Sequence, residues 1–138
     1  MQPNPKQEAE RWLFYAERDL GFARMGIELG GYYSQTCFMA GQSVEKALKA
    51  LLYLRGMRLV REDSVSELLM RVTDVHPGLD RYRDMAGRLD RYHSVSRYLG
   101  VPPGIAPYEE IGEAQAQEAV GQGENLVLEV RNIIRLAR

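Results

Sequence analysis

Hydrophobic positions in this chain recur mainly at steps of three and four, the spacing of one face of an α-helix. Asn4-Pro5 has the residue types of a helix start, because asparagine caps helices well and proline is tolerated at the first helical position. Gly30-Gly31 has the residue type that commonly ends a helix. A second helix is expected from about Tyr32 to Arg55, with Gly56 as its stop. The short connection between them predicts a long antiparallel helical hairpin.

Each helix of this hairpin carries a stripe that is expected to face a core. In the first helix the stripe consists of Leu13, Ala16, Leu20, Ala23 and Ile27, widened by Trp12, Phe14, Tyr15 and Phe22. In the second helix it consists of Cys37, Gly41, Val44, Leu48 and Leu51. We therefore expect the two helices to pack on each other and on the helices that follow.

Three further helices are predicted downstream. Ser64-Val65-Ser66-Glu67 matches a capping box, so a short helix should run to about Val75, where Pro77-Gly78 breaks it. A fourth should begin near Leu79 and end between Tyr92 and Arg97. Three prolines and two glycines between Leu99 and Pro107 predict a loop. The last helix should begin near Ile111 and have the stripe Ala116, Val120, Gly123, Val127, Val130, Ile134 and Ala137.

These elements predict an all-α fold, an up-and-down antiparallel bundle of about five helices without a sheet. A chain of 138 residues is the size of one domain, so residues 1–138 are expected to form a single domain. Gly121 and Gly123 weaken the last helix, so a close contact between helices is expected there.

Polar residues also recur at helical spacing in the second helix, where they form a polar ridge of Gln42, Glu45, Lys46 and Lys49. Glu45 and Lys49 are four apart in the favourable order, so composition alone favours a solvated face with a surface ion pair. The functional alternative is that an amide, a carboxylate and two ammonium groups on one rigid helix bind a nucleotide or a partner.

The charge balance gives no global indication of a nucleic-acid or membrane partner, since the net charge is -1. Cys37 is the one cysteine and lies on the apolar stripe, so a reduced, cytoplasmic setting is expected. No segment approaches the ~20 apolar residues of a membrane-spanning helix. His76 has no ligand at metal-binding spacing, and we expect neither a metal nor a cofactor.

A basic segment interleaved with aromatic residues follows the third helix. Such a composition suits phosphate contacts combined with base stacking. Only Asp84 and Asp90 oppose its charges. Its members are Arg81, Tyr82, Arg83, Arg88, Arg91, Tyr92, His93, Arg97 and Tyr98.

Arg88 and His93 form a sharper pattern within this segment, Arg-x-x-x-Tyr-His. Cleavage of RNA without a metal needs a proton shuttle and a cation for the charge that develops on phosphorus. Histidine meets the first need and arginine the second. The alternative is structural, with Arg88 in a surface ion pair and His93 in a packing or helix-end position.

Several of these residues, in order and spacing, resemble the HEPN family (higher eukaryotes and prokaryotes nucleotide-binding domain). The matching positions span nearly the whole chain. They are Ala16-Glu17-Arg18-Asp19-Leu20, Phe22-Ala23, Gly31-Tyr32-Tyr33, Cys37-Phe38, Gln42, Glu45-Lys46-Ala47-Leu48-Lys49-Ala50, Gly56, Leu89, Tyr92 and Arg97-Tyr98.

The resemblance implies a helical bundle, usually a homodimer, often paired with a minimal nucleotidyltransferase in a toxin-antitoxin-like pair. It implies a nucleotide- or RNA-binding module, with Gln42, Glu45, Lys46, Lys49, Arg91, Tyr92, Arg97 and Tyr98 as binding candidates. Some family members are metal-independent endoribonucleases whose Arg-His motif forms a composite site near the dimer interface. In this chain that motif falls on Arg88 and His93.

Overall fold

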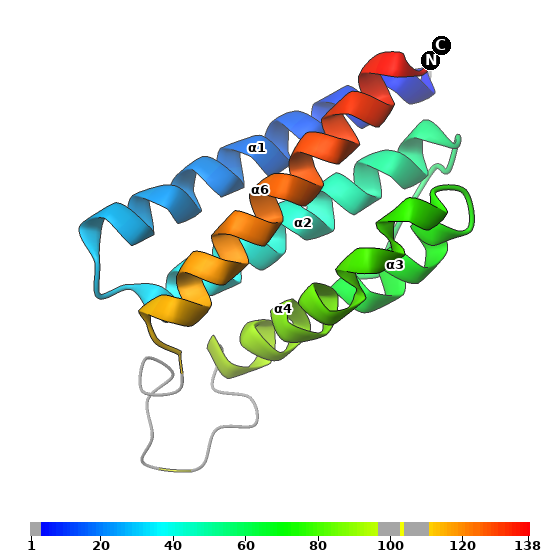
Figure 1. The fold of residues 1–138 in the computed structure, drawn as a ribbon. Coiled ribbons are helices and arrows are strands. Elements are labelled where there is room, and N and C mark those ends of the chain that lie inside the picture. The colour runs from blue at the N-terminus through cyan, green and yellow to red at the C-terminus, as the bar shows by residue number, and fades with distance from the viewer. Residues whose placement is uncertain (1–3, 97–102, 104–110) are drawn as a thin grey trace.

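The computed structural model describes residues 4–96, 103 and 111–138. Within them the chain forms five α-helices and one 3-10 helix, with no strand. The helices are α1 (Pro5–Leu29), α2 (Tyr33–Leu54), α3 (Val65–Thr73), the 3-10 helix η1 (Pro77–Tyr82), α4 (Arg83–Ser96) and α6 (Glu113–Leu136). The helices pack as an elongated bundle (Figure 1). The predicted all-α class is confirmed.

The hairpin of α1 and α2 begins and ends where its capping residues predict. The Asn4 Oδ1 accepts a hydrogen bond from the Gln7 backbone N–H at 2.8 Å. Gly30 and Gly31 have φ angles of 74° and 80°, and Gly56 has 94°. This left-handed region is open to glycine at little steric cost, which explains why a glycine follows the end of each helix, directly after α1 and one residue after the Arg55 cap of α2.

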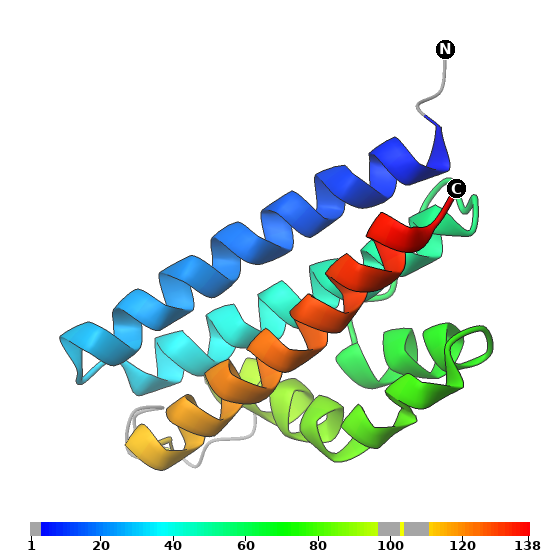
Figure 2. The same cartoon turned by 45° about the horizontal axis from the view of Figure 1, so that its top comes forward.

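Helix α2 is the central element of the bundle. It packs against α1, α3, α4 and α6, and α4 lies on the opposite side of α2 from α1 in both views (Figures 1 and 2). Its predicted stripe is buried, but Ser43 and Glu45 are buried as well. The expectation of one apolar and one solvated face is wrong, because helices surround α2 on several sides.

Helix α1 is amphipathic, but its buried stripe is narrower than the sequence suggests. Leu13, Ala16, Leu20 and Ala23 are buried, and Trp12 and Ile27 are partly buried. Three of the aromatic residues that were expected to widen the stripe face solvent instead: the exposed fractions are 56% for Phe14, 45% for Tyr15 and 60% for Phe22. This part of the prediction is wrong, because α2 and α6 cover only one sector of α1.

The tightest contact of the hairpin lies at Gly26 of α1. A Cβ at this position would lie 2.0 Å from the Oγ1 of Thr36 on α2. The contact expected at Gly121 and Gly123 is looser. A Cβ at Gly123 would meet Val44 at an ordinary 3.6 Å, and nothing beyond its own helix lies within 4 Å at Gly121.

The second half of the chain differs from the prediction in one element. The expected fourth helix is divided into η1 and α4, with the boundary between Tyr82 and Arg83. Most of the predicted stripe of α6 is confirmed, since its first six members are buried: Ala116, Val120, Gly123, Val127, Val130 and Ile134. The seventh, Ala137, lies just beyond the helix and is only partly buried. Apart from Pro103, the expected loop from Leu99 to Pro107 lies outside the described residues.

Candidate functional site

The polar ridge of α2 lies between helices. The Lys46 Nζ is 2.5 Å from the Asp19 Oδ2 on α1. The Lys49 Nζ is 3.4 Å from the Glu45 Oε1 and 5.6 Å from the centroid of the Trp12 ring. The Glu45–Lys49 ion pair is present, but its interpretation as a solvated surface pair is wrong, because the two side chains are only 8% and 14% exposed.

Glu45 is the buried carboxylate of a small charge cluster. Burial raises its pKa, and the charge and hydrogen bond of Lys49 oppose that rise. The charge of Asp63 raises the pKa further, whereas the charge of His93 lowers it. Lys49, Asp63 and His93 therefore all act electrostatically on Glu45. Buried carboxylates with shifted pKa values are frequent in functional sites and also occur in structural ion-pair networks. Gln42, one turn earlier on α2, is half-buried.

Arg88 is held on the α6 side of α4. Its Nε lies 2.9 Å from the Glu118 Oε1, and its Nη2 donates a hydrogen bond to the Gln122 Oε1 at 2.9 Å. The side chain of Arg88 is 38% exposed. The guanidinium thus has a fixed direction while part of it remains open to solvent.

His93 lies on the α2 side of α4. Its ring packs on Phe38 with centroids 5.3 Å apart and an angle of 32° between the planes. Five positions along an α-helix correspond to one turn plus about 140°. Arg88 and His93 therefore leave α4 in different directions, and within one chain they contact α6 and α2 respectively.

The remaining members of the basic segment have different surroundings. Arg91 is exposed, whereas Tyr92 is buried and belongs to the core. Burial raises the pKa of Tyr92. Base stacking on Tyr92, which the sequence suggests, would need that core to open. Arg97 and Tyr98 lie outside the described residues.

Tyr82 and Arg81 connect η1 to α6. The Tyr82 hydroxyl donates a hydrogen bond to Glu129, and Arg81 forms an ion pair with the same carboxylate. Burial, together with Glu129, raises the pKa of Tyr82 to about 12. Part of the basic and aromatic segment is therefore used to hold the bundle together.

Asp90 has a role that the sequence did not reveal. Its carboxylate accepts hydrogen bonds from the backbone N–H groups of Val65 at 2.7 Å and Ser66 at 3.1 Å, and from the Ser64 hydroxyl at 2.9 Å. These donors belong to the start of α3, where a negative charge is favoured. The capping box at Ser64 indicated that start, but nothing in the sequence pointed to a partner 25 residues downstream.

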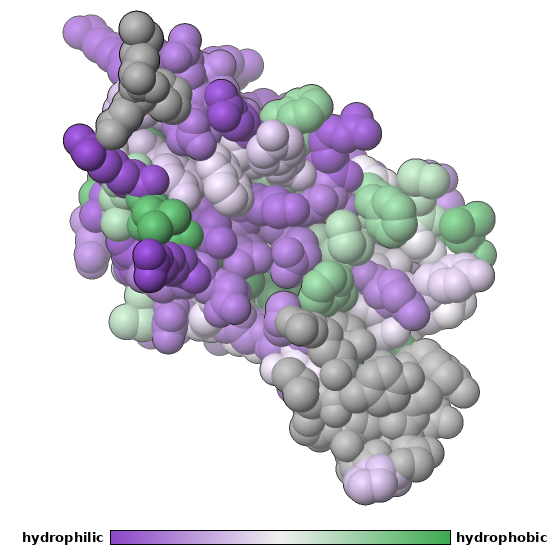
Figure 3. Space-filling view, turned by 180° about the vertical axis from the view of Figure 1, so that it is seen from behind, coloured by the Kyte–Doolittle hydropathy of each residue, from purple (hydrophilic) through white to green (hydrophobic). Residues whose placement is uncertain are grey.

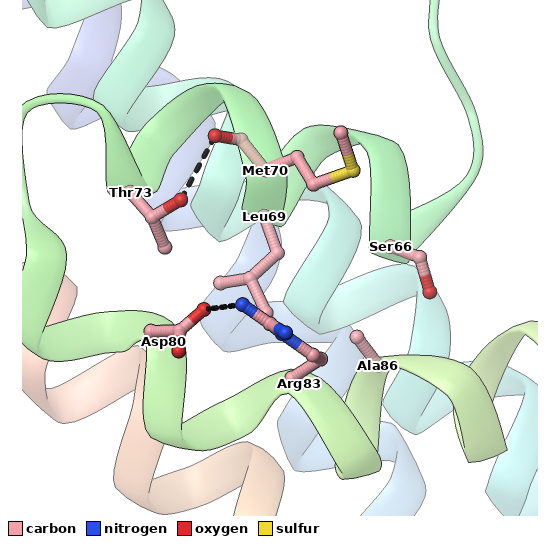
Figure 4. Close-up of a pocket in the computed structure, with 7 residues that line it drawn as sticks. All are labelled: Ser66, Leu69, Met70, Thr73, Asp80, Arg83 and Ala86. Carbon is pink, nitrogen blue, oxygen red and sulfur yellow. Dashed lines mark hydrogen bonds and ion pairs between the residues drawn. The ribbon is translucent and has the colours of Figure 1, made fainter.

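A hollow of about 320 Å³ lies between α3 and the region where η1 meets α4 (Figure 4). Its main charged groups, Asp80 and Arg83, bind each other at 2.5 Å, so neither is turned to a ligand. Of the candidate residues that the sequence pointed to, only Arg83 of the basic segment lines it. The lining residues are Ser66, Leu69, Met70, Thr73, Asp80, Arg83 and Ala86.

The described part of the chain contains neither a metal-binding cluster nor a membrane-spanning helix. No group of three or more His, Cys, Asp or Glu side chains there is arranged to hold a metal ion. No helix there combines the length and apolar character needed to cross a membrane.

The structure is an elongated helical bundle whose described candidate residues lie on two helices, α2 and α4. The family model of the HEPN domain matches residues 9–133, and the chain belongs to this family. ST0689, an archaeal HEPN homologue, is 35% identical, with a TM-score of 0.74 over 92% of this chain and 98% of that one. TT1696 from Thermus thermophilus is 27% identical, with a TM-score of 0.81 over 91% and 97%. No curated protein matches.

Proposed function

We propose that this chain is a nucleotide- or RNA-binding HEPN module that acts as a homodimer. In this proposal it is the partner of a minimal nucleotidyltransferase in a toxin-antitoxin-like pair. Membership of the HEPN family supports the proposal as a whole, and the chemistry of α4 supports its nucleic-acid part.

The observation that carries the RNA-binding part is the pair Arg88 and Arg91 on α4. They are three positions apart, so they are neighbours on one face of the helix. Arg91 is exposed, and Arg88 is partly exposed with its guanidinium held by α6. Guanidinium groups form strong, directional hydrogen bonds with phosphate oxygens. This face can contact two phosphates of one strand.

The other candidates take supporting roles in this proposal. Lys49 and Glu45 form a buried ion pair that is electrostatically influenced by His93, and Gln42 and Lys46 extend the same face of α2. Tyr92 supports α4 from the core. Arg97 and Tyr98, at the end of the basic segment, supply a further cation and a stacking ring.

Binding experiments test the proposal directly. The purified protein is titrated with fluorescently labelled single-stranded RNA and with a nucleotide analogue at low salt. Co-purification tests binding to a minimal nucleotidyltransferase. Binding to at least one of the three supports the module, and binding to none of them contradicts it.

A second function, a metal-independent endoribonuclease, is favoured by the defined position of His93, whose ring packs on Phe38 of α2 with centroids 5.3 Å apart. Histidine is the side chain that most often transfers protons in catalysis. In this alternative His93 transfers the proton, Arg88 stabilises the phosphoryl transition state, and two chains form a composite site. It predicts RNA cleavage in EDTA that His93→Ala abolishes and Arg88→Ala strongly reduces. Undiminished cleavage by the His93→Ala protein contradicts this assignment.

A further inference from the structure

Arg88 of α4 contacts α6 through one edge of its guanidinium group. The Nε lies 2.9 Å from the Glu118 Oε1, and the Nη2 donates a hydrogen bond to the Gln122 Oε1 at 2.9 Å. Nε and Nη2 form the lateral edge of the planar guanidinium group, whose five N–H donors have a fixed fork geometry. The protein itself therefore occupies this edge.

The terminal edge of the same guanidinium group, between Nη1 and Nη2, is available to a ligand. Nη1 forms no hydrogen bond with a described residue, and the Arg88 side chain is 38% exposed. Two N–H donors on one edge can bind two oxygens of a single phosphate group. Hydrophilic residues also cover much of the back of the molecule (Figure 3), so polarity alone does not mark a site. What distinguishes Arg88 is a guanidinium group with one edge occupied and the other open.

Glu118 and Gln122 can hold Arg88 together because they are four positions apart on α6. Residues at this spacing are neighbours on one helix face, so one side chain reaches Nε and the other reaches Nη2. A long arginine side chain loses rotamer freedom when it binds a ligand, and immobilising it beforehand reduces that loss. The two contacts therefore prepare Arg88 to bind an anion in one orientation.

Glu118 also has an effect that Gln122 lacks. Its carboxylate is 51% exposed beside Arg88, so it partly neutralises the positive charge that attracts a phosphate. Gln122 is uncharged and only directs the guanidinium group. Both residues thus fix the direction of Arg88, but Glu118 in addition weakens its attraction for anions.

We propose that Glu118 and Gln122 are positioning residues for RNA. They direct the terminal edge of Arg88 to one backbone phosphate, and the charge of Glu118 limits the strength of that contact. This role rests on the RNA-binding function proposed for α4, and it identifies the bound group as a phosphodiester held by two hydrogen bonds. If Glu118 only attached α4 to α6, its charge would have no influence on RNA binding.

RNA titrations of two variants test this role. Glu118→Gln keeps an oxygen acceptor for Nε and removes the charge, so it should bind single-stranded RNA about three- to tenfold more tightly at about 50 mM salt. The dependence of its log affinity on log salt should be steeper, by up to ~0.7. Gln122→Ala removes a hydrogen bond between α6 and Arg88 without changing the charge, so it should bind about two- to tenfold more weakly with the slope of the parent.

Glu113→Gln and Gln117→Ala are the matched controls. Both residues are exposed on α6, and the Gln117 Nε2 donates a hydrogen bond to the Glu113 Oε1 within that helix at 3.2 Å. Each control should change RNA affinity less than the corresponding variant at Glu118 or Gln122. Circular dichroism melting shows that all four variants are folded at the temperature of the titrations.

NMR spectra of isotopically labelled arginine side chains show which edge of Arg88 the RNA contacts, with Arg88→Lys identifying the signals. RNA should shift the Nη signals and leave the Nε signal nearly unchanged, because Glu118 keeps the lateral edge. Without RNA, Glu118→Ala should lose the protected Nε–H signal, and Glu118→Gln should retain it.

The possible outcomes separate this role from RNA binding itself. A parent protein that binds no RNA contradicts the proposed function and this inference together. If the parent binds RNA but Glu118→Gln binds no more tightly than Glu113→Gln, the inference alone is overturned. A large shift of the Arg88 Nε signal on adding RNA also overturns it, because the phosphate would then have displaced Glu118.

Discussion

The imidazole of His93 packs on the ring of Phe38, with 5.3 Å between the centroids. This contact joins α4, which carries the candidate chemistry, to α2, the centre of the bundle. Glu45, on the same helix as Phe38, is a nearly buried carboxylate whose pKa is influenced by His93 as well as by its ion-pair partner Lys49. The position of the histidine is thus tied to the core of the fold.

The burial of Glu45 predicts a pH-dependent cost to stability. Its folded pKa is raised above the ordinary value of 4.5, so the folded state binds this proton more tightly than the unfolded state does. The resulting stabilisation is present below pH 4.5 and is lost as the pH rises through the folded pKa. The free energy of unfolding of the parent, relative to Glu45→Gln, should therefore fall as the pH rises from below 4.5 through the folded pKa of Glu45. Urea titrations at several pH values measure this difference, and a constant or rising difference contradicts the account.

Two glycines in the helices should respond to alanine in opposite directions. Gly26→Ala forces a Cβ to 2.0 Å from the Thr36 Oγ1 and should destabilise the protein by about 1–3 kcal/mol. Gly123→Ala meets Val44 and Leu20 at ordinary distances of 3.6 and 3.8 Å, so the helix preference for alanine should stabilise it by up to ~1 kcal/mol. Urea denaturation gives both values, and a Gly26→Ala protein as stable as the parent would show that the hairpin is less tightly packed.

The carboxylate of Asp90 should stabilise the start of α3. Asp90→Ala removes hydrogen bonds to Ser64, Val65 and Ser66 and should cost about 2 kcal/mol. Asp84→Ala, on an exposed position of the same helix, is the matched control and should cost less. Thermal and urea denaturation compare the two variants. Equal losses of stability in the two variants would mean that the hydrogen bonds of Asp90 contribute no more than the exposed carboxylate of Asp84 does.

The helices and their ends could be predicted because their signals are local. Asn4, Ser64 and the glycines at 30, 31 and 56 act through hydrogen bonds or backbone angles within a few residues. The surroundings of α2 could not be predicted in the same way. Glu45 and Lys49 have residue types that are usually exposed, and their burial depends on which helices pack around α2.

The candidate site could be predicted only in part, because the surroundings of its residues also depend on how the helices pack. The sequence shows that Arg88 and His93 lie five positions apart, but not that α6 binds one and α2 packs on the other. On α1 the sequence misleads in the other direction, because residues that were expected to be buried are exposed. Phe14 and Phe22 have the hydrophobicity of core residues, yet the tertiary arrangement leaves them facing solvent.

The central claim is that the Arg88–Arg91 face of α4 binds nucleic acid. Replacing Arg91, together with Arg97, by glutamate should weaken RNA binding and flatten its salt dependence, because fewer counterions are released on binding. Arg135→Glu is the matched control for each charge reversal, since Arg135 is exposed at the far end of α6, about 20 Å along the helix from Gln122.

The most direct measurement is the RNA dissociation constant of the parent, Arg91→Glu and Arg135→Glu proteins between 50 and about 200 mM salt. The account predicts that Arg91→Glu binds more weakly than the parent at low salt and has a shallower dependence of log affinity on log salt. Arg135→Glu should stay close to the parent in both respects. Equal affinities and slopes for the parent and Arg91→Glu would contradict the claim that this face of α4 binds RNA.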